Sequence, residues 1–377
     1  MIITSRQTPH YVLILKISLG ILILCGTIML YSASSQISLE RYGNSNVYFF
    51  HHLQRLFIAT LLGISCYLID YHTFQKHIRL LYLLTLLAVI FPYIQNVIQG
   101  YSGPARWIRI GGLTLQTAEA FRFTLIIYLA THLSKKQEDI LIYKKGLLPA
   151  VILLGIPLLL LAMAPDFSSA LILLIIAFII LYIGGIPLKH IAITSLPVLP
   201  LAFLFVRLSP YRWQRVLVFM EKDANISDSA YQINQSLISL ANGGFTGTGL
   251  GKSMLKNLYL PEAHTDFIYA IIGEEWGFLG AIFFILLYVF IFFCLIRLSL
   301  DVQDPYEKFI VLGINTSLIL YALINMGVTV GLFPVTGLPM PFVSYSGSQI
   351  LINGALLGIL FRIIKENFNT GKHVKKY

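Results

Sequence analysis

The sequence predicts an all-α polytopic membrane protein of about ten transmembrane helices, with one long structured extracytoplasmic loop. Of its 377 residues, 57% are hydrophobic and 12% are charged, whereas a soluble protein carries about 25% charged residues. Apolar runs long enough to cross a bilayer recur along the whole chain. We therefore expect one integral membrane domain over residues 1–377, with its long loop at about residues 207–265.

The apolar runs define the predicted spans, which are Val12–Tyr31, His52–Ile69, Leu80–Val97, Ala118–Leu133, Gly146–Met163, Phe167–Ile186, Leu188–Phe205, Phe267–Ile296, Phe309–Phe333 and Ser348–Ile364. An even number of spans puts both termini on one side. Most of the 27 Lys and Arg residues flank the segments on the side of the N-terminus, so the positive-inside rule places both termini in the cytoplasm. The predicted location is the cytoplasmic (inner) membrane.

The charge pattern, the cysteines and the first apolar run argue against nucleic-acid binding, a disulfide or metal site, and a cleaved signal peptide. The net charge of +10 comes from basic residues that flank apolar spans, which indicates topology signals and anionic lipid rather than nucleic acid. Cys25, Cys66 and Cys294 lie inside apolar runs, so no disulfide or metal site is predicted. The first apolar run lacks a small-residue cleavage signal, and we interpret it as a retained span.

The long loop contains its own helix signal. Ser229 and Gln232 fit a capping box, and a short amphipathic helix would follow to Leu240. Asn242-Gly243-Gly244 is a strong stop signal. The stretch 247–253 resembles a phosphate-binding loop, but Thr246 stands where the first glycine belongs. Glycines that permit tight turns explain it better than a nucleotide site.

Asp266 lies where this loop meets the apolar run Phe267–Ile296. That run would form about 45 Å of helix, more than the roughly 30 Å of a bilayer core. The helix must tilt, protrude, or kink near Gly277 or Gly280. Asp266 would lie near the outer membrane surface as a candidate catalytic carboxylate. The alternative is helix capping, with Thr265 as the N-cap and Asp266 in the first turn.

Other charged residues fall at the same depth. Arginines cluster with Trp and Tyr around residues 106–109 and 207–215. They would either anchor the protein at the membrane interface or form a cationic cradle for a diphosphate. Glu119 and Arg122 are three residues apart, on one helix face, which predicts a structural ion pair. Glu274 is a second candidate partner for Arg122.

Three further acids and one irregular stretch require a polar environment. Asp166, Glu274 and Glu275 adjoin apolar spans, so each must meet a polar cavity, a cation or a proton. The stretch 334–348 is too rich in Pro, Gly and Ser to be a helix. Non-helical backbone at membrane depth must line protein or a cavity. We expect this stretch to form the re-entrant wall of a groove.

Several of these segments together resemble the SEDS family (shape, elongation, division and sporulation). The matching motifs are Arg106-Trp-Ile, Gln116-Thr-Ala-Glu119, Ala164-Pro-Asp166-Phe-Ser-Ser-Ala170, Tyr231-Gln-Ile-Asn-Gln-Ser236, Tyr259-Leu-Pro-Glu-Ala-His-Thr-Asp-Phe-Ile268 and Pro341-Phe-Val-Ser-Tyr-Ser-Gly347. They occur in order over nearly the whole chain. The stretches Tyr231–Ser236 and Tyr259–Ile272 resemble the division-type (FtsW) pattern more than the elongation-type (RodA) pattern, and we favour the division-type branch.

The resemblance implies a membrane glycosyltransferase that polymerises lipid II into peptidoglycan glycan strands. Asp266 matches the catalytic Asp of the family, and Glu119 and Arg122 match its Glu and Lys pair. The chain departs from the family pattern at Thr117-Ala118, at Arg122 in place of Lys, and at Ser346 in place of Gly. The residues expected to bind the diphosphate or other parts of lipid II are Arg106, Arg109, Arg212, Arg215, Lys252, Glu262, His264 and Ser344.

The resemblance also implies partners and a cofactor. A divalent cation, Mg or Mn, would assist the reaction. A class B penicillin-binding protein transpeptidase with one transmembrane helix would bind, along with other divisome or elongasome membrane proteins. We expect its helix to dock on the last three spans, where Gly327, Gly331 and Gly354 permit close approach.

Two other functions stay open at this point. A lipid II flippase or secondary transporter also has about ten spans, intramembrane acids and broken segments. It would be favoured by an internal inverted repeat, which is not evident in the sequence. A non-enzymatic scaffold that recruits a synthase would not need Asp, Arg and Glu concentrated at one depth.

Overall fold

Ten helices of the computed structural model correspond to the ten predicted spans. The structure describes residues 9–99, 105–110, 113–136, 138–164, 166–220, 228–253 and 263–369. The helices are α1 (His10–Tyr42), α2 (Val47–Leu68), α4 (Ile78–Gln99), α5 (Thr117–Lys135), α7 (Leu148–Met163), α8 (Phe167–Ile183), α9 (Leu188–Arg207), α12 (Ile268–Asp301), α13 (Pro305–Thr329) and α14 (Gly347–Ile364). Seven of them are long and apolar enough to cross a membrane, and α7 and α8 are shorter apolar helices. The polytopic α-helical prediction is confirmed.

Short elements join these helices. They are α3 (Tyr71–Lys76), α6 (Tyr143–Gly146), α10 (Pro210–Met220), α11 (Asp228–Gly243) and the π-helical turn η1 (Lys365–Asn369). α11 is the short helix that the sequence predicted in the long loop, although it begins at Asp228, before the predicted cap at Ser229, whereas α10 was not predicted. α11 ends at Gly243, and Gly244 follows with a φ of +53°, so the predicted stop signal is confirmed.

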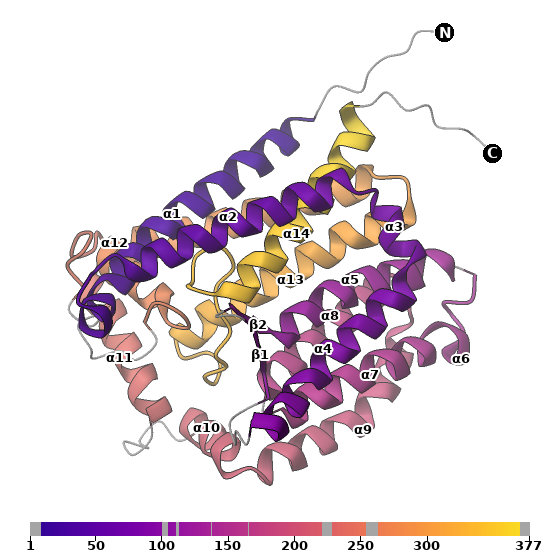
Figure 1. The fold of residues 1–377 in the computed structure, drawn as a ribbon, viewed down its shortest axis with the longest axis horizontal. Coiled ribbons are helices and arrows are strands. Elements are labelled where there is room, and N and C mark those ends of the chain that lie inside the picture. Colours follow the sequence, from indigo (N-terminus) through magenta and orange to yellow (C-terminus); the bar gives the residue numbers. More distant parts are fainter. Residues whose placement is uncertain are drawn as a thin grey trace.

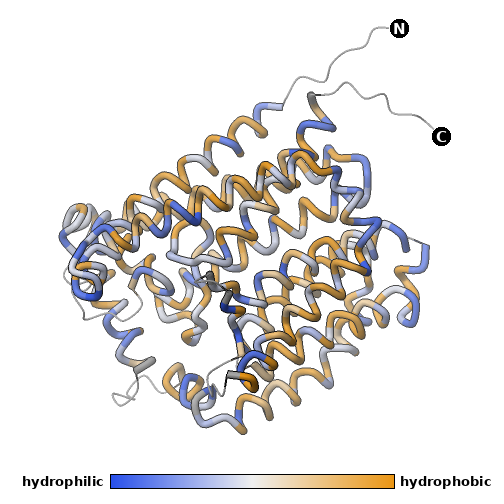
Figure 2. The backbone as a smooth tube through the Cα atoms, in the orientation of Figure 1, coloured by the Kyte–Doolittle hydropathy of each residue, from blue (hydrophilic) through white to orange (hydrophobic). Residues whose placement is uncertain are grey.

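The helices form two groups that meet at α13 (Figure 1). α2 packs along α14, and α1 packs along α12. On the other side, α4, α5, α7 and α8 pack together, and α13 contacts both α12 and α5. Apolar residues dominate the long helices, while hydrophilic residues collect at many of their ends and in the connections (Figure 2). α13 is the most enclosed candidate span, with 72% of its most apolar window buried.

α2 and α14 approach closely through small residues. An added Cβ on Gly354 would lie 2.3 Å from the Ala59 carbonyl oxygen, and one on Gly358 would lie 2.0 Å from that of Gly63. Real Cβ atoms do not approach so closely, so larger residues would force the helices apart. Gly354 is therefore already covered by α2 of the same chain. The expectation that it receives a partner helix is wrong.

α12 breaks where the sequence predicted a kink. Gly277 has φ +68° and ψ −165°, a conformation almost restricted to glycine. Phe278 N donates to Gly244 O at 3.0 Å across the break, so the loop after α11 satisfies a backbone group that the break frees. The kink lies at Gly277 and is fixed by contact with residues 243–249.

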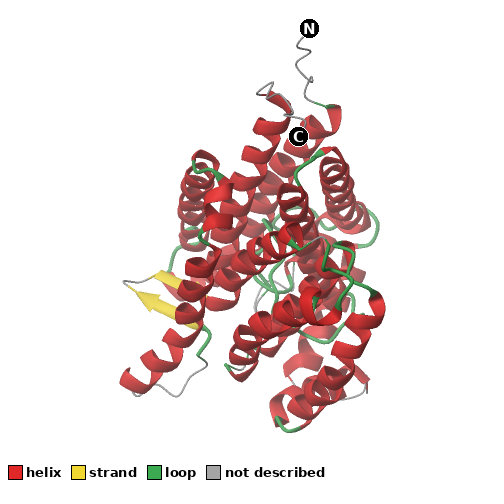
Figure 3. Cartoon of the chain, turned by 90° about the vertical axis from the view of Figure 1, so that its right-hand side faces the viewer, coloured by secondary structure: helices red, strands yellow, loops and turns green. Residues whose placement is uncertain are grey.

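A β-hairpin was not predicted from the sequence. β1 (Trp107–Ile110) and β2 (Leu113–Gln116) pair antiparallel, with Trp107 opposite Gln116. Figure 3 shows this hairpin at the side of the helix bundle. Gln116 N donates to Ser348 Oγ at 2.7 Å, which ties the hairpin to the start of α14. The hairpin holds the residue before it, Arg106, at the entrance to α5.

The first turn of α1 lies beside η1. Tyr11 and Phe368 pack edge to face with ring centroids 6.5 Å apart, and Tyr11 Oη donates to Asp301 Oδ2 at 2.5 Å. Asp301 is the last residue of α12, and Asp266 precedes the first. The part of α12 after the break at Gly277, residues 278–301, alone spans about 36 Å of helix, so Asp266 lies far from the end that carries the described termini.

Candidate active site

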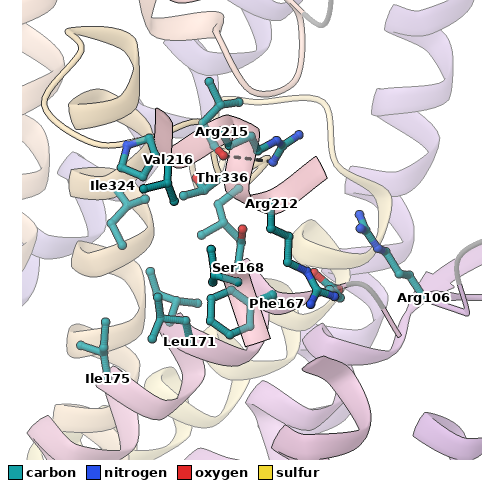
Figure 4. A pocket seen from close by; sticks show the side chains of 16 residues that line it. Arg106, Phe167, Ser168, Leu171, Ile175, Arg212, Arg215, Val216, Ile324 and Thr336 are labelled. Carbon is teal, nitrogen blue, oxygen red and sulfur yellow. Dashed lines mark hydrogen bonds between the residues drawn. The ribbon is translucent and has the colours of Figure 1, made fainter. Parts of the chain in front are cut away.

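A cavity of about 170 Å³ opens between α8, α10, α13 and the irregular segment after α13. Its polar lining comprises Arg106, Asp166, Ser168, Arg212, Arg215 and Thr336. In Figure 4 the arginines gather toward one end, while Leu171 and Ile175 of α8 lie at the other. The cavity is therefore amphipathic, with a cationic end and an apolar end.

Arg212 and Arg215 both belong to α10, whereas Arg106 precedes β1. Local contacts orient the two arginines of α10. Arg212 Nη2 donates to Ala162 O at 3.2 Å, and its guanidinium lies 4.2 Å from the Phe205 ring centroid. Arg215 Nη1 donates to Val335 O at 3.0 Å. Burial and, second, the charge of Arg106 lower the pKa of Arg212 from its ordinary value. An arginine stays protonated at neutral pH even so, and an anion in the cavity would relieve the repulsion.

Asp166 supplies the carboxylate of the cavity. It precedes α8 and is 6% exposed. Gln116 Nε2, from the hairpin, donates to Asp166 Oδ2 at 2.9 Å. The prediction that Asp166 meets a polar cavity is confirmed. With one carboxylate against three guanidinium groups, the lining is net cationic.

Asp266 lies directly behind one wall of this cavity. Thr336 and Leu338 line the cavity, and Gly337 between them has φ +73°. A Cβ added to Gly337 would lie 3.4 Å from Asp266 Oδ2. Asp266 is half-buried and precedes α12 by two residues, with Phe267 as the N-cap. The capping alternative is therefore wrong in detail, because neither Thr265 nor Asp266 occupies the cap or the first turn.

The segment between α13 and α14 forms the predicted wall. Asn325 Nδ2 donates to Asp266 O and to Leu338 O, both at 2.8 Å, and so ties the Asp266 turn to this segment. Ser344 is 3% exposed, and its Oγ accepts from Met340 N at 2.8 Å. The Ser344 hydroxyl thus stabilises a turn of the wall. Its expected contact with substrate stays a prediction.

Glu119 and Arg122 form the predicted ion pair in the core. Arg122 Nη2 lies 2.7 Å from Glu119 Oε2, and the two side chains are 0% and 4% exposed. Arg122 also donates to Asn353 Oδ1 at 2.7 Å and to Ser317 Oγ at 3.3 Å. These contacts join α5, α13 and α14. Glu274, the alternative partner, lies elsewhere.

Glu274 and Glu275 contact the glycine-rich loop, which is the stretch 247–253 that resembles a phosphate-binding loop. Glu274 accepts from the hydroxyls of Ser239 and Ser253, and Glu275 accepts from Ser32 Oγ at 2.6 and 2.7 Å. Thr248 N donates to Glu274 O at 2.9 Å, and Gly249 N donates to Glu275 O at 3.0 Å. These loop amides bind the chain itself and not a phosphate, so the interpretation of the glycines as turn formers is confirmed.

Three further predicted residues, Arg109, Lys252 and His264, lie outside the cavity lining. Lys252 is exposed on the glycine-rich loop, and Arg109 is exposed on β1. His264 is 4% exposed, and its ring lies 5.0 Å from that of Tyr48 and 5.6 Å from that of Tyr345. Glu262 lies outside the described residues. Their roles in substrate binding stay predictions.

Ser168 and Thr336 line the cavity but were not singled out from the sequence. Ser168 belongs to the motif around Asp166, and Thr336 belongs to the stretch 334–348 that was predicted to form a wall. Their hydroxyls carry no charge, and only the fold shows that they face the same space. The available signal in the sequence is position: Ser168 lies two residues after Asp166, and Thr336 lies next to Gly337.

Comparisons with known proteins show the family of this chain and agree with its fold. Residues 12–369 match the family model of FtsW, RodA and SpoVE, described as "Cell cycle protein". A probable peptidoglycan glycosyltransferase FtsW of Saccharophagus degradans is 36% identical over 354 residues, which cover 92% of this chain and 90% of that protein. The protein of the same name from Trichlorobacter lovleyi is 36% identical over 376 residues, 98% of each chain.

Solved structures show the same fold. A chain from a study of how a peptidoglycan synthase complex coordinates polymerisation and crosslinking superposes with a TM-score of 0.76 at 24% identity, covering 94% of this chain and 97% of that chain. The rod shape determining protein RodA of Thermus thermophilus superposes with a TM-score of 0.68 at 23% identity, covering 94% and 96%. By the family match over nearly its whole length, the chain belongs to the FtsW/RodA/SpoVE family of cell cycle proteins.

Proposed function

We propose that this protein is a peptidoglycan glycosyltransferase that polymerises lipid II into glycan strands during cell division. The observation that carries the proposal is the position of Asp266 beside a cavity with a cationic end and an apolar end. Lipid II joins an apolar tail to a sugar through a diphosphate, and this order matches the lining. The division role is favoured because the relatives at 36% identity are named FtsW.

Each part of the site has a distinct task in this proposal. The guanidinium groups of Arg106, Arg212 and Arg215 bind the diphosphate oxygens, for which their planar geometry is suited. Leu171 and Ile175 contact the first part of the lipid tail. A cavity of about 170 Å³ is smaller than a typical ligand pocket of roughly 300–1,000 Å³. It takes the diphosphate region, while the sugars and the rest of the tail lie outside it.

In the proposed reaction, the donor sugar is transferred to a hydroxyl group of the acceptor sugar. The hydroxyl oxygen of the acceptor sugar bonds to the anomeric carbon of the donor sugar. The bond from that carbon to the diphosphate oxygen breaks, and the diphosphate leaves with the electron pair. Asp266 accepts the hydroxyl proton as general base. The arginines stabilise the negative charge that develops on the leaving group.

We propose that a divalent cation would bind at the diphosphate of the substrate and not at a site formed by protein ligands alone. Among the described residues, the group of three with metal-ligand geometry is His72, Asp304 and Glu307, which belong to α3 and the start of α13 and not to the Asp266 region. Mg²⁺ binds to one or two carboxylates together with substrate phosphates. A Mg²⁺ or Mn²⁺ ion would therefore be held mainly by the diphosphate. When bound, it would neutralise charge on the leaving group.

Strand synthesis from lipid II by purified protein tests the function. We expect polymer from the wild type and a decrease of about two to four orders of magnitude for Asp266→Asn, the usual contribution of a positioned acid–base group. The apparent melting temperature should be unchanged. Asp139→Asn is the matched control. Asp139 forms an exposed ion pair with Lys145 and is far from Asp266 in the sequence, so this variant should polymerise lipid II normally.

The possible outcomes separate the alternatives. A folded Asp266→Asn protein with near-normal polymerisation would refute the base assignment. No polymer from the wild type, together with transport of lipid II across vesicles, would favour the flippase. No polymer and no transport, with retained binding of a synthase, would favour the scaffold.

We also propose a partner surface on α12 for a single-pass transpeptidase. Gly327 and Gly331, like Gly354, are covered within the chain, Gly327 by Phe333 and Gly331 by the side chains of α11. Of the last three spans, α12 retains the largest exposed apolar stripe, formed by Leu279, Phe283, Leu286, Phe290 and Phe293. The spacing of four and three residues matches the seam by which one helix packs along another.

The orientation in the membrane belongs to the same proposal. We place both termini in the cytoplasm and Asp266 at the outer face of the inner membrane. The bias of Lys and Arg toward the segments on the side of the N-terminus supports this orientation, as does the meeting of α1 and η1 at one end of the bundle.

A further inference from the structure

We propose that a groove between α1, α2 and α14, at the end that carries the described termini, binds the headgroup of an anionic phospholipid. The groove has a volume of about 270 Å³. It is lined by Lys16, Tyr67, Phe361, Ile364 and Lys365. Two of these five residues are cationic and none is acidic. It lies near η1, far from the arginine-lined cavity, so the proposal goes beyond the glycosyltransferase function.

The two lysines present charge to this groove from different helices. Lys365 Nζ lies 5.2 Å from the centroid of the Tyr67 ring, a cation–π contact that orients the ammonium. Lys16 is exposed on α1 and forms no ion pair with the described residues. The neighbouring Arg362 instead pairs with Glu366, with its Nε 2.6 Å from Oε1. The phosphate of a lipid would give Lys16 a counter-charge.

The groove lies at the depth of lipid headgroups. Tyr67 is the last residue but one of α2, and Lys365 follows the last residue of α14. α1 has 33 residues, about 50 Å of helix, so its first turns extend beyond a hydrocarbon core of about 30 Å. Lys16, in the second turn, reaches the same level. The proposed topology makes this side cytoplasmic, where basic groups attract anionic lipids.

Adjacent apolar surface distinguishes a lipid from a free anion. Gly20 lies one turn deeper than Lys16 on the same face of α1, and an added Cβ there would meet no atom within 4 Å. Ile17 and Ile64 nearby on α1 and α2 are 52% and 50% exposed. Phe361 and Ile364 complete the apolar wall. An acyl chain would continue from the groove along this surface.

Native mass spectrometry of the purified full chain with added lipid tests the proposal. We expect one phosphatidylglycerol molecule to bind at least about ten-fold more tightly than phosphatidylcholine, because each lysine near a phosphate contributes a several-fold gain. The variant K16Q/K365Q should lose this preference, and each single variant should lose about half of it on a logarithmic scale. K16R/K365R should retain it.

The control variant removes the same number of positive charges at positions outside the groove. K189Q/K308Q replaces two lysines near the starts of α9 and α13, outside the groove, and should bind phosphatidylglycerol as the wild type does. Unchanged preference in folded K16Q/K365Q or in both single variants would overturn the site. Equal occupancy by inorganic phosphate would show a free-anion site and would overturn the lipid assignment. Because no polymerisation is measured, these outcomes are independent of the glycosyltransferase proposal.

Discussion

At the residue scale, the Glu119–Arg122 pair shows how a membrane core holds charge. Arg122 is fully buried and bonded to Glu119, Ser317 and Asn353, and its guanidinium lies 5.0 Å from the Tyr321 ring centroid. A buried ion pair stabilises little against an apolar replacement of similar shape, but removal of one partner leaves an uncompensated charge. The pair therefore acts as a joint between α5, α13 and α14.

This joint gives a prediction for stability. Glu119→Ala should destabilise the protein by about 3–5 kcal/mol, because Arg122 stays buried without its counter-charge. The apparent melting temperature measures the loss. Glu138→Ala, at an exposed position, is the control and should change stability by less than about 0.5 kcal/mol.

A second change at the same joint separates a structural role from a role in the site. Glu119→Leu combined with Arg122→Met removes both charges and should restore most of the lost stability. A Glu119→Ala protein that melts like the wild type but polymerises lipid II poorly would contradict the structural interpretation. The pair would then belong to the substrate site.

For single residues, the sequence predicted which charged side chains matter but not which tertiary contacts they make. Asp266, Glu119 and Arg122 stood out because charges at the edge of apolar runs are rare. The sequence did not reveal that Gly337 separates Asp266 from the cavity, because that contact joins residues about 70 positions apart. Ser344 was expected to face the substrate, but its hydroxyl accepts from Met340 N. Hydroxyl groups serve turns and sites equally well, and only tertiary contacts distinguish them.

At the element scale, the long helices were predictable because a bilayer requires long apolar runs. The β1–β2 hairpin was missed, although Trp107-Ile-Arg-Ile and Leu113-Thr-Leu-Gln alternate in polarity around Gly111-Gly112. This alternation is typical of a hairpin. The same stretch was interpreted only as an arginine cluster that could bind a diphosphate. The kink at Gly277 was predicted from helix length, whereas its contact with Gly247 was not.

The exposed stripe on α12 gives a prediction at this scale. A photocrosslinking residue at Phe290 should crosslink to a co-expressed class B transpeptidase, because Phe290 belongs to the stripe and is 52% exposed. Leu199 on α9 is the control, since it is 65% exposed but belongs to a helix that we expect to face lipid. Crosslinks from Leu199 and none from Phe290 would disprove the surface.

At the scale of the whole molecule, the ion pair of the core, the cavity and the α2–α14 contact depend on one another. α14 contributes Asn353 to the Arg122 joint, Ser348 to the hairpin and Gly354 to the contact with α2. α13 contributes Ser317 to the joint and Asn325 to the Asp266 turn. A shift of either helix would therefore move the wall that separates Asp266 from the arginines.

The same architecture predicts the topology. α1 and η1 meet at one end, and the turn that carries Asp266 precedes the opposite end of α12. With both termini in the cytoplasm, Lys145 of α6 should lie inside and Lys252 of the glycine-rich loop should lie outside, and both are exposed. Single cysteines at these positions, with Cys25, Cys66 and Cys294 replaced by alanine, allow the test. An impermeant maleimide added to intact spheroplasts should label position 252 and should label position 145 only after lysis. Labelling of both positions from outside would disprove the span count, and labelling of 145 alone would reverse the orientation and remove Asp266 from the outer surface.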